Sequence, residues 1–202
     1  IDSRGRNTAA LKAIDLATKK ERVLAEDAKA DAGAALVHPT EKTIQAVSFN
    51  YDRNSWKVLN GSVRGDLEYL KGVCPGDVTV DDRSLDDKTW IVSYVVDDGS
   101  PRWYLYDRAA KKANFLFAAR KGLEGLKLAH MHPELIKSRD GLTLVSYLTL
   151  PVGTDPDNDG IPNHPVPMVL NVHGGPWARD TWGYRGEVQW LANRGYAVLQ
   201  VN

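Results

Sequence analysis

The chain has 202 residues, of which 43% are hydrophobic and 26% charged, and these proportions exclude a disordered, collagen-like or coiled-coil protein. Basic and acidic residues number 26 each, so the net charge is zero and we expect no nucleic-acid partner, because binding a phosphate backbone needs a basic excess. The longest apolar runs, 90–96 and 166–172, are much shorter than the ~18 residues that cross a bilayer, so we expect no membrane partner.

The first two thirds of the sequence contain a repeat of about 46 residues. The segment 42–49 matches 88–95 at an offset of 46 residues, and 15–24 matches 107–116 at 92, twice that offset. Short β-branched or aromatic runs separated by turn-forming clusters predict four strands in one period, at 77–81, 89–96, 102–106 and 113–118. Four strands in a period of this length are typical of a β-propeller blade.

A helix is predicted over 63–71, where Leu67 and Leu70 follow a helical spacing at the junction of two repeats. We expect about two blades between residue 1 and roughly residue 130. Because a closed propeller needs ~4–8 blades, the remaining blades are expected upstream of Ile1.

The pattern changes after Pro133. An alternating strand is predicted over 142–150, a continuous apolar strand over 166–172, a helix over 183–194 with Gly195 as its cap, and a buried strand over 196–201. Strand, glycine-rich loop, helix and buried strand form a βαβ unit, which is the signature of a mainly parallel α/β sheet. Because the last residues read as a buried strand, we expect the chain to be a fragment.

The sequence His173-Gly-Gly-Pro-Trp177 directly follows the predicted strand at 166–172. Glycines let backbone N–H groups approach a ligand oxygen, and α/β-hydrolases build half of their oxyanion hole from such a loop. Gly174 N–H is the candidate donor, and His173 and Gly175 are expected to shape the loop. A glycine pair after a strand is also a common turn, so the tripeptide alone leaves that alternative open.

Five segments closely resemble the start of the catalytic domain in the prolyl oligopeptidase family (S9) of serine peptidases, particularly its acylaminoacyl-peptidase and dipeptidyl-peptidase branches. They are Ser138-Arg-Asp-Gly-Leu-Thr-Leu, Tyr147-Leu-Thr-Leu-Pro151, Pro167-Met-Val-Leu, His173-Gly-Gly-Pro-Trp177 and Asn193-Arg-Gly-Tyr-Ala-Val-Leu-Gln-Val-Asn202. The resemblance implies a mixed fold in which both domains are incomplete. Residues 1–133 would be C-terminal blades of a β-propeller, and 134–202 the N-terminal portion of an α/β-hydrolase catalytic domain.

The resemblance also implies a Ser–Asp–His peptidase that acts on short peptides, without a cofactor. In α/β-hydrolases the nucleophile, the acid and the histidine all follow this βαβ unit, and none of them is present here. Ser62 is rejected as nucleophile because Gly61-Ser-Val-Arg-Gly65 has the wrong spacing. His173 precedes the place of the triad histidine, so a hydrogen bond that orients the loop is its expected role. We therefore expect the chain by itself to be inactive.

Three further features have a structural and a functional interpretation. Asp155-Pro-Asp157-Asn-Asp159-Gly160 matches the first half of an EF-hand calcium loop, but a solvated turn is favoured because Val166 replaces the final Glu. His130 and His132 could form half of a metal site, and a hydrogen-bonded pair near the domain junction is favoured. Trp177 is expected to pack in a core or interface, with lining of a substrate pocket as the alternative.

Two other functions remain open on the sequence alone: a non-catalytic propeller module that binds a partner and keeps a vestigial hydrolase segment, and an esterase.

The single Cys74 excludes an internal disulfide and is expected to be buried. The compartment is unknown, because no targeting segment is present in these residues. Unpaired strand edges at both ends predict low solubility or association, including a homo-oligomer.

Overall fold

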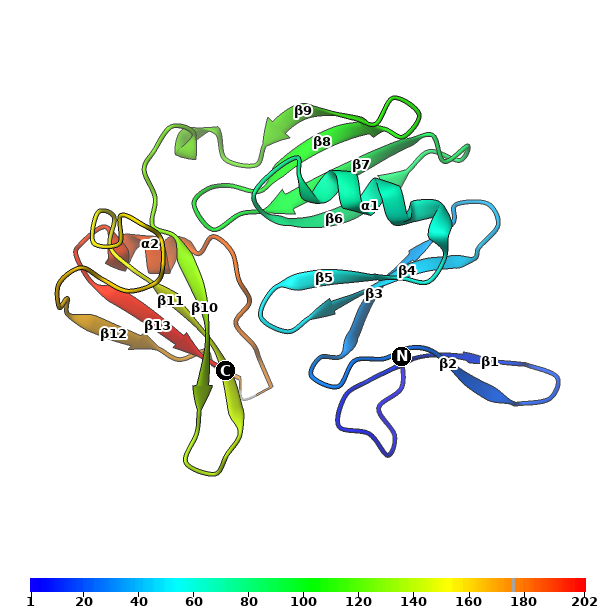
Figure 1. Cartoon of the computed structure of the whole chain (residues 1–202), viewed down its shortest axis with the longest axis horizontal. Coiled ribbons are helices and arrows are strands. Elements are labelled where there is room, and N and C mark those ends of the chain that lie inside the picture. Colours follow the sequence, from blue (N-terminus) through cyan, green and yellow to red (C-terminus); the bar gives the residue numbers. More distant parts are fainter. Residues whose placement is uncertain (176) are drawn as a thin grey trace. The chain divides into compact units, whose positions relative to one another are not determined.

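The computed structural model describes residues 1–175 and 177–202, so Pro176 of the His-Gly-Gly-Pro motif lies outside the described residues. The chain divides into two compact units (Figure 1). The first comprises residues 1–94 and 103–116, and the second comprises 95–102 and 117–202. Among the described residues, the helices are too short and too polar to cross a bilayer.

The first unit is built from three successive sheets that follow the chain in order. They are a pair, β1 (Leu11–Ile14) and β2 (Glu21–Ala25); a three-stranded sheet, β3 (Ala32–Val37), β4 (Ile44–Asn50) and β5 (Asn54–Val58); and a four-stranded sheet, β6 (Asp77–Arg83), β7 (Thr89–Val95), β8 (Arg102–Asp107) and β9 (Lys112–Ala118). All four strands predicted for one period are present and lie next to one another, as a propeller blade requires.

The 46-residue repeat reappears in the positions of these strands. β6 and β7 begin 45 residues after β3 and β4, and β8 and β9 begin 91 residues after β1 and β2, within one residue of the repeat and of twice the repeat. The turn between the outer strands is also repeated, because Lys19 (φ +57°) and Lys111 (φ +49°) occupy the same left-handed position. The pair β1–β2 therefore corresponds to the outer half of a blade.

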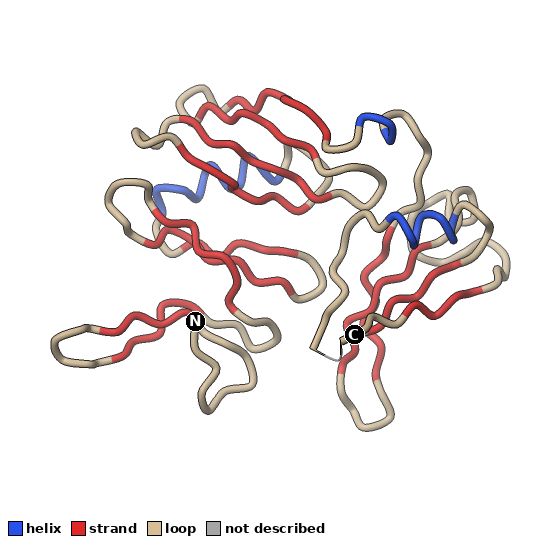
Figure 2. The backbone as a smooth tube through the Cα atoms, turned by 180° about the vertical axis from the view of Figure 1, so that it is seen from behind, coloured by secondary structure: helices blue, strands red, loops and turns tan. Residues whose placement is uncertain are grey.

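The helix α1 (Arg64–Lys71) follows β5 along the chain at the point of the repeat where β9 follows β8. A short 3-10 turn over Gly61–Val63 precedes it (Figure 2). Leu67 and Leu70 are buried, as the helical spacing predicts. Tyr94 donates its hydroxyl hydrogen to the carbonyl of Leu70 at 2.6 Å, which attaches the helix to β7.

A network of buried charges lies between α1 and the strands. The carboxylate of Asp87 accepts hydrogen bonds from Arg83 Nε at 2.6 Å and from the Trp90 indole at 2.7 Å, and Arg108 also donates to it. Both guanidinium groups lie over the Trp90 ring, 4.8 and 4.7 Å from its centroid. Charge-assisted hydrogen bonds and cation–π contacts thus stabilise these charged groups where they are removed from water.

The second unit contains the βαβ arrangement that the sequence predicts. Its sheet has the order β10-β11-β13-β12, with β10 (Met131–Lys137), β11 (Thr143–Thr149), β12 (Met168–Asn171) and β13 (Ala197–Val201). β10, β11 and β13 pair antiparallel, whereas β12 and β13 are parallel and are connected through α2 (Gly186–Ala192). Val145, Tyr147 and Thr149 of β11 are buried, as the sequence predicts for one face of the strand, but Ser146 between them is buried as well.

Two sequence predictions in this unit need correction, and one strand was not predicted. The strand expected over 166–172 is limited to Met168–Asn171 and lies at the sheet edge, where Met168 and Leu170 are more than half exposed. The helix expected over 183–194 is shorter, because Gly183 has φ +133° and stays outside the helix. β10 was not predicted, and the expected boundary between 133 and 134 falls inside it.

Candidate active site

The carboxyl ends of two parallel strands define the candidate site. Asn171 of β12 lies opposite Gln200 of β13, so the chain that leaves β12 begins beside the end of β13. Parallel α/β sheets bind ligands at this edge, because loops and helix N-termini converge there. The predicted His173-Gly-Gly loop starts at this position, two residues after β12 ends.

The loop itself is glycine-dependent. His173 Nδ1 lies 3.0 Å from the carbonyl oxygen of Gly174, a contact in which the ring donates. Gly175 has φ +149°, and a Cβ placed there would lie 2.8 Å from the backbone nitrogen of Trp177. A Cβ built on Gly174 would meet no described atom within 4 Å. A side chain at 175 would therefore disturb the loop, whereas position 174 has room for one.

Trp177 is almost fully exposed, at 98% of its surface. This contradicts the expectation that it packs in the core of this chain, and packing in an interface stays a prediction. Its assignment as a substrate-pocket residue stays a prediction. Trp182, which follows five residues later, is buried instead and donates its indole hydrogen to the carbonyl of Met131 at 2.7 Å.

The side chain of Asn202 holds the segment that follows the His-Gly-Gly motif at Asp180. The amide of Asn202 bonds both backbone groups of Asp180, through Oδ1 at 2.7 Å and through Nδ2 at 3.1 Å. Tyr184 N donates to the carbonyl of Val96 at 2.8 Å. The segment 180–184 is therefore fixed between β13, β10 and the turn after β7. Sequence reasoning missed these attachments, since they depend on residues distant in the chain.

No catalytic triad forms among the described residues. The rings of the five histidines contact carboxylates, backbone groups, Thr40 and Asn163, and none of these contacts involves a serine hydroxyl. Ser62, which the sequence already rejected, lies in the 3-10 turn, and its Oγ accepts a hydrogen bond from Gln45 at 3.0 Å. The candidate donor Gly174 thus lies in a chain without an assembled nucleophile and base.

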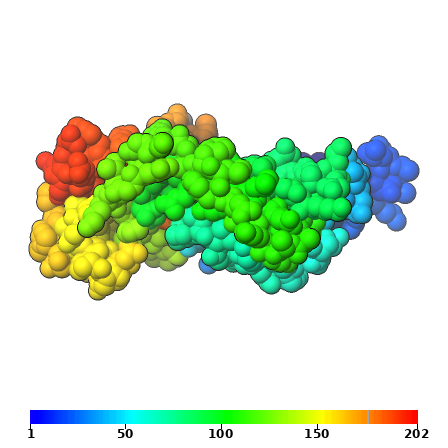
Figure 3. Space-filling view, turned by 90° about the horizontal axis from the view of Figure 1, so that it is seen from above, coloured from blue at the N-terminus to red at the C-terminus, as the bar shows by residue number. Residues whose placement is uncertain are grey.

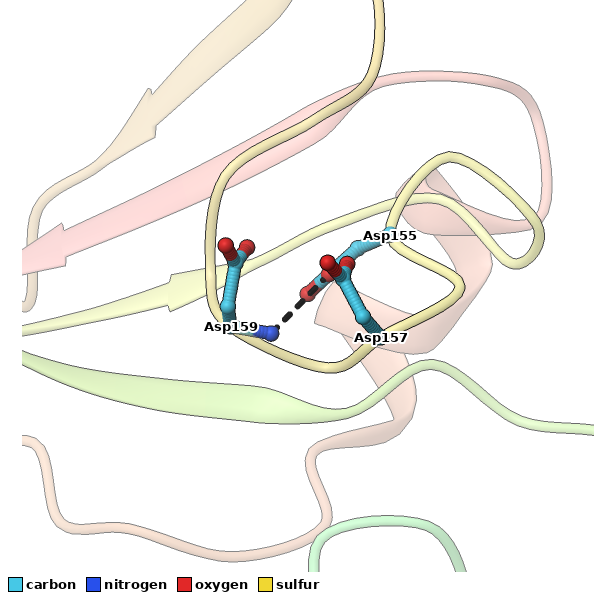
Figure 4. Close-up of side chains that lie close together, drawn as sticks. All are labelled: Asp155, Asp157 and Asp159. Atoms are coloured by element: carbon cyan, nitrogen blue, oxygen red, sulfur yellow. Dashed lines mark hydrogen bonds between the residues drawn. The ribbon is translucent and has the colours of Figure 1, made fainter.

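The acidic loop brings its three carboxylates together. One oxygen from each of Asp155, Asp157 and Asp159 lies within 4.8 Å of the others (Figure 4). Asp155 is half-buried, with a side chain only 5% exposed, and it accepts hydrogen bonds from the backbone N–H groups of Asp159 at 3.1 Å and Gly160 at 3.0 Å. Burial raises the pKa of Asp155, but these bonds and the charge of a nearby imidazole outweigh it, so the pKa lies below its ordinary value.

That imidazole belongs to His132, whose Nε2 lies 3.1 Å from Asp155 Oδ2. A Cβ added to Gly160 would lie 3.2 Å from the same ring, so the loop packs directly on His132. The contacts already made by Asp155 account for its ionised state without a cation. The calcium site expected as an alternative at Asp155, Asp157 and Asp159 stays a prediction.

His130 and His132 contact different carboxylates. His130 Nδ1 lies 3.2 Å from Asp97, and this carboxylate also accepts the backbone N–H of Met131 at 2.8 Å. Both rings border a cavity of about 420 Å³ between the segment 126–130 and the loop 150–158. That loop is drawn yellow on the surface in Figure 3. The described residues of the His-Gly-Gly loop do not line this cavity.

No family model matches the sequence, but two curated proteins are clearly related to it. The chain is 56% identical over 201 residues to dipeptidyl aminopeptidase BIII of Pseudoxanthomonas mexicana, and 36% identical over 199 residues to dipeptidyl peptidase family member 6 of Caenorhabditis elegans. These alignments cover 100% and 91% of this chain. The chain spans only 29% and 27% of the length of the two relatives.

Solved structures show the same fold at low sequence identity. A puromycin-hydrolyzing peptidase of Mycobacterium tuberculosis superposes with a TM-score of 0.66 at 16% identity, covering 96% of this chain and 30% of the peptidase. Dipeptidyl peptidase 4 of Porphyromonas gingivalis gives a TM-score of 0.64 at 15% identity, covering 96% and 27%. The homologues and structural neighbours confirm the resemblance to the prolyl oligopeptidase family, and the successive sheets match the β-propeller segment of these enzymes.

Proposed function

We propose that this chain is part of a serine peptidase of the prolyl oligopeptidase family that hydrolyses short peptides. Within that family we propose that the longer protein is a dipeptidyl peptidase. The identity of 56% to a dipeptidyl aminopeptidase along the whole chain carries this proposal. The parallel pair β12 and β13, connected through α2, supports the α/β-hydrolase part of it. In this proposal residues 134–202 begin the catalytic domain and 1–133 belong to the propeller.

The chemistry expected of these residues is electrostatic. A serine nucleophile attacks the peptide carbonyl, and the carbonyl oxygen becomes an oxyanion in the tetrahedral intermediate. The N–H of Gly174 would donate a hydrogen bond to that oxyanion, because Gly174 follows β12 at the carboxyl edge of the parallel pair. The nucleophile and base must come from residues outside this chain, so the 202 residues alone provide part of an oxyanion hole without catalysis.

The longer protein that contains this chain tests the proposed activity. We expect it to release p-nitroaniline from a dipeptidyl p-nitroanilide, and to be labelled by a fluorophosphonate at a single serine outside residues 1–202. Hydrolysis of a p-nitrophenyl ester without any anilide cleavage would favour an esterase. A well-folded protein without turnover or labelling would favour a propeller that only binds a partner.

The isolated chain tests the expected inactivity. We expect neither turnover nor fluorophosphonate labelling of residues 1–202, since a serine hydroxyl without a base is a weak nucleophile. Labelling of Ser62 or of any other serine in this chain would contradict the assignment of the chemistry to residues outside it.

A further inference from the structure

The side chain of Asn202 binds three backbone groups at the end of β13. Its Oδ1 accepts the N–H of Asp180 at 2.7 Å, and its Nδ2 donates to the carbonyls of Asp180 at 3.1 Å and Val145 at 2.9 Å. The amide therefore pairs with Asp180 on both sides, as a neighbouring strand would, and ties this point of the loop to β11.

The position of Asn202 relates these bonds to the candidate site. Asn171 and Gln200 are partners in the parallel pair, so His173 and Asn202 both lie two residues beyond that pair. The loop that starts at His173 returns to Asp180, where the Asn202 amide holds it. One side chain thus fixes Asp180, six residues after Gly174 in the sequence, at the end of β13.

The hydrogen-bonding capacity of the amide decides what kind of role it can have. Both hydrogens of Nδ2 are directed at carbonyl oxygens, and Oδ1 accepts an N–H. A reversed amide would place an NH₂ group against an N–H and an oxygen against two carbonyls, so this orientation is determined by its partners. With both donors used, the amide of Asn202 cannot donate to a substrate.

We propose that Asn202 is a positioning residue of the peptidase: its amide fixes Asp180, downstream of the His-Gly-Gly motif, and through it the direction of the N–H of Gly174 toward the developing oxyanion. This proposal rests on the proposed function. Two further bonds, from Trp182 to Met131 and from Tyr184 to Val96, fix the far end of the loop. The Asn202 bonds lie closer along the sequence to the His-Gly-Gly motif than these two.

The decisive variant is Asn202→Asp in the longer protein. The carboxylate keeps the size of the side chain and the acceptor for Asp180, but it removes both donors and places a negative charge against two carbonyl oxygens. Because loss of an oxyanion donor costs about 10²–10³-fold in kcat, we expect a displaced donor to lower kcat about 10- to 100-fold. KM should change less than twofold, and the affinity for a peptide aldehyde, which forms a tetrahedral adduct, should fall in parallel with kcat.

Asn193→Asp is the matched control, since Asn193 is exposed at the end of α2 and undergoes the same chemical change. It should leave kcat, KM and aldehyde affinity unchanged. The ratio of Asn202→Asp activity to wild-type activity should rise as the pH falls, because a protonated carboxyl group recovers one donor. A loss confined to KM, or an unchanged kcat, would overturn the proposal.

Hydrogen exchange separates failure of this proposal from failure of the proposed function. In Asn202→Asp, amides of residues 177–184 should exchange at least 10-fold faster than in wild type, while β11 remains protected. If the wild-type protein has no peptidase activity, the proposed function and the catalytic part of this inference both fail, and faster exchange shows only that Asn202 holds the loop. If activity is present but exchange and kcat are unaffected, the positioning role is wrong and the proposed function stands.

Discussion

Replacing Asp87 with Asn tests whether the charge network of the first unit stabilises the fold. Asp87 has φ +55°, a conformation that Asn tolerates as well as Asp, so the substitution removes the charge without adding backbone strain. The carboxylate is 6% exposed and lies next to Arg83, whose side chain is also 6% exposed. The variant therefore leaves a buried guanidinium without its anion.

The size of the effect follows from these contacts. Breaking a buried ion pair by removing one partner costs about 3–5 kcal/mol. Asn keeps one oxygen that can still accept the Trp90 indole hydrogen, and Arg108 keeps its bond to Asp66 at 2.8 Å, so the lower end applies. We expect a loss of about 3 kcal/mol, which corresponds to roughly 100-fold faster exchange through local opening.

Hydrogen exchange measured by mass spectrometry on peptides from β6, β7 and β8 provides the assay, because it reports the local opening free energy even if the chain associates. Asp86→Asn is the matched control, since that carboxylate is 58% exposed and should contribute little. Protection that changes less than twofold in Asp87→Asn would refute the reasoning, and so would an equal effect of both variants.

Three further predictions concern the acidic loop. Because the pKa of Asp155 is lowered in the folded state, its contribution should be complete above the unfolded value of about 4 and disappear as the pH falls through the lower folded pKa. The melting-temperature difference between wild type and Asp155→Asn should therefore shrink as the pH falls from about 5 toward 3; an opposite slope in that range would contradict the assigned contacts. Gly160→Ala should lower the free energy of unfolding by about 1–2 kcal/mol for its left-handed backbone, and further because the new Cβ would press on His132. The control Gly153→Ala should show only the backbone cost. Equal losses of the two variants in denaturant unfolding would rule out the packing on His132. We expect no heat when calcium is titrated to millimolar concentration, because the carboxylate oxygens of Asp155 already contact backbone N–H groups and His132. A saturable heat signal would instead establish the calcium loop.

Much of the fold was predictable because the repeat and the hydrophobic alternation are local signals. The four strands of the complete blade, the helix α1 and the buried face of β11 follow from side chains a few residues apart. The predicted burial of Cys74 is also confirmed, as expected for a small apolar side chain. β10 was missed because its exposed Leu135 and Ile136 interrupt the alternation of a half-buried strand.

The site divides in the same way. The sequence by itself determined the order of strand, glycine-rich loop, helix and strand, and with it the position of Gly174 after a parallel strand. The partners of the surrounding side chains could not be predicted, because Asn202 meets Asp180 and Val145, and His132 meets Asp155, only after distant segments pack together. Hydrogen bonds between such segments depend on distance and angle, which local patterns do not encode, so the tertiary structure alone decided how the loop is held.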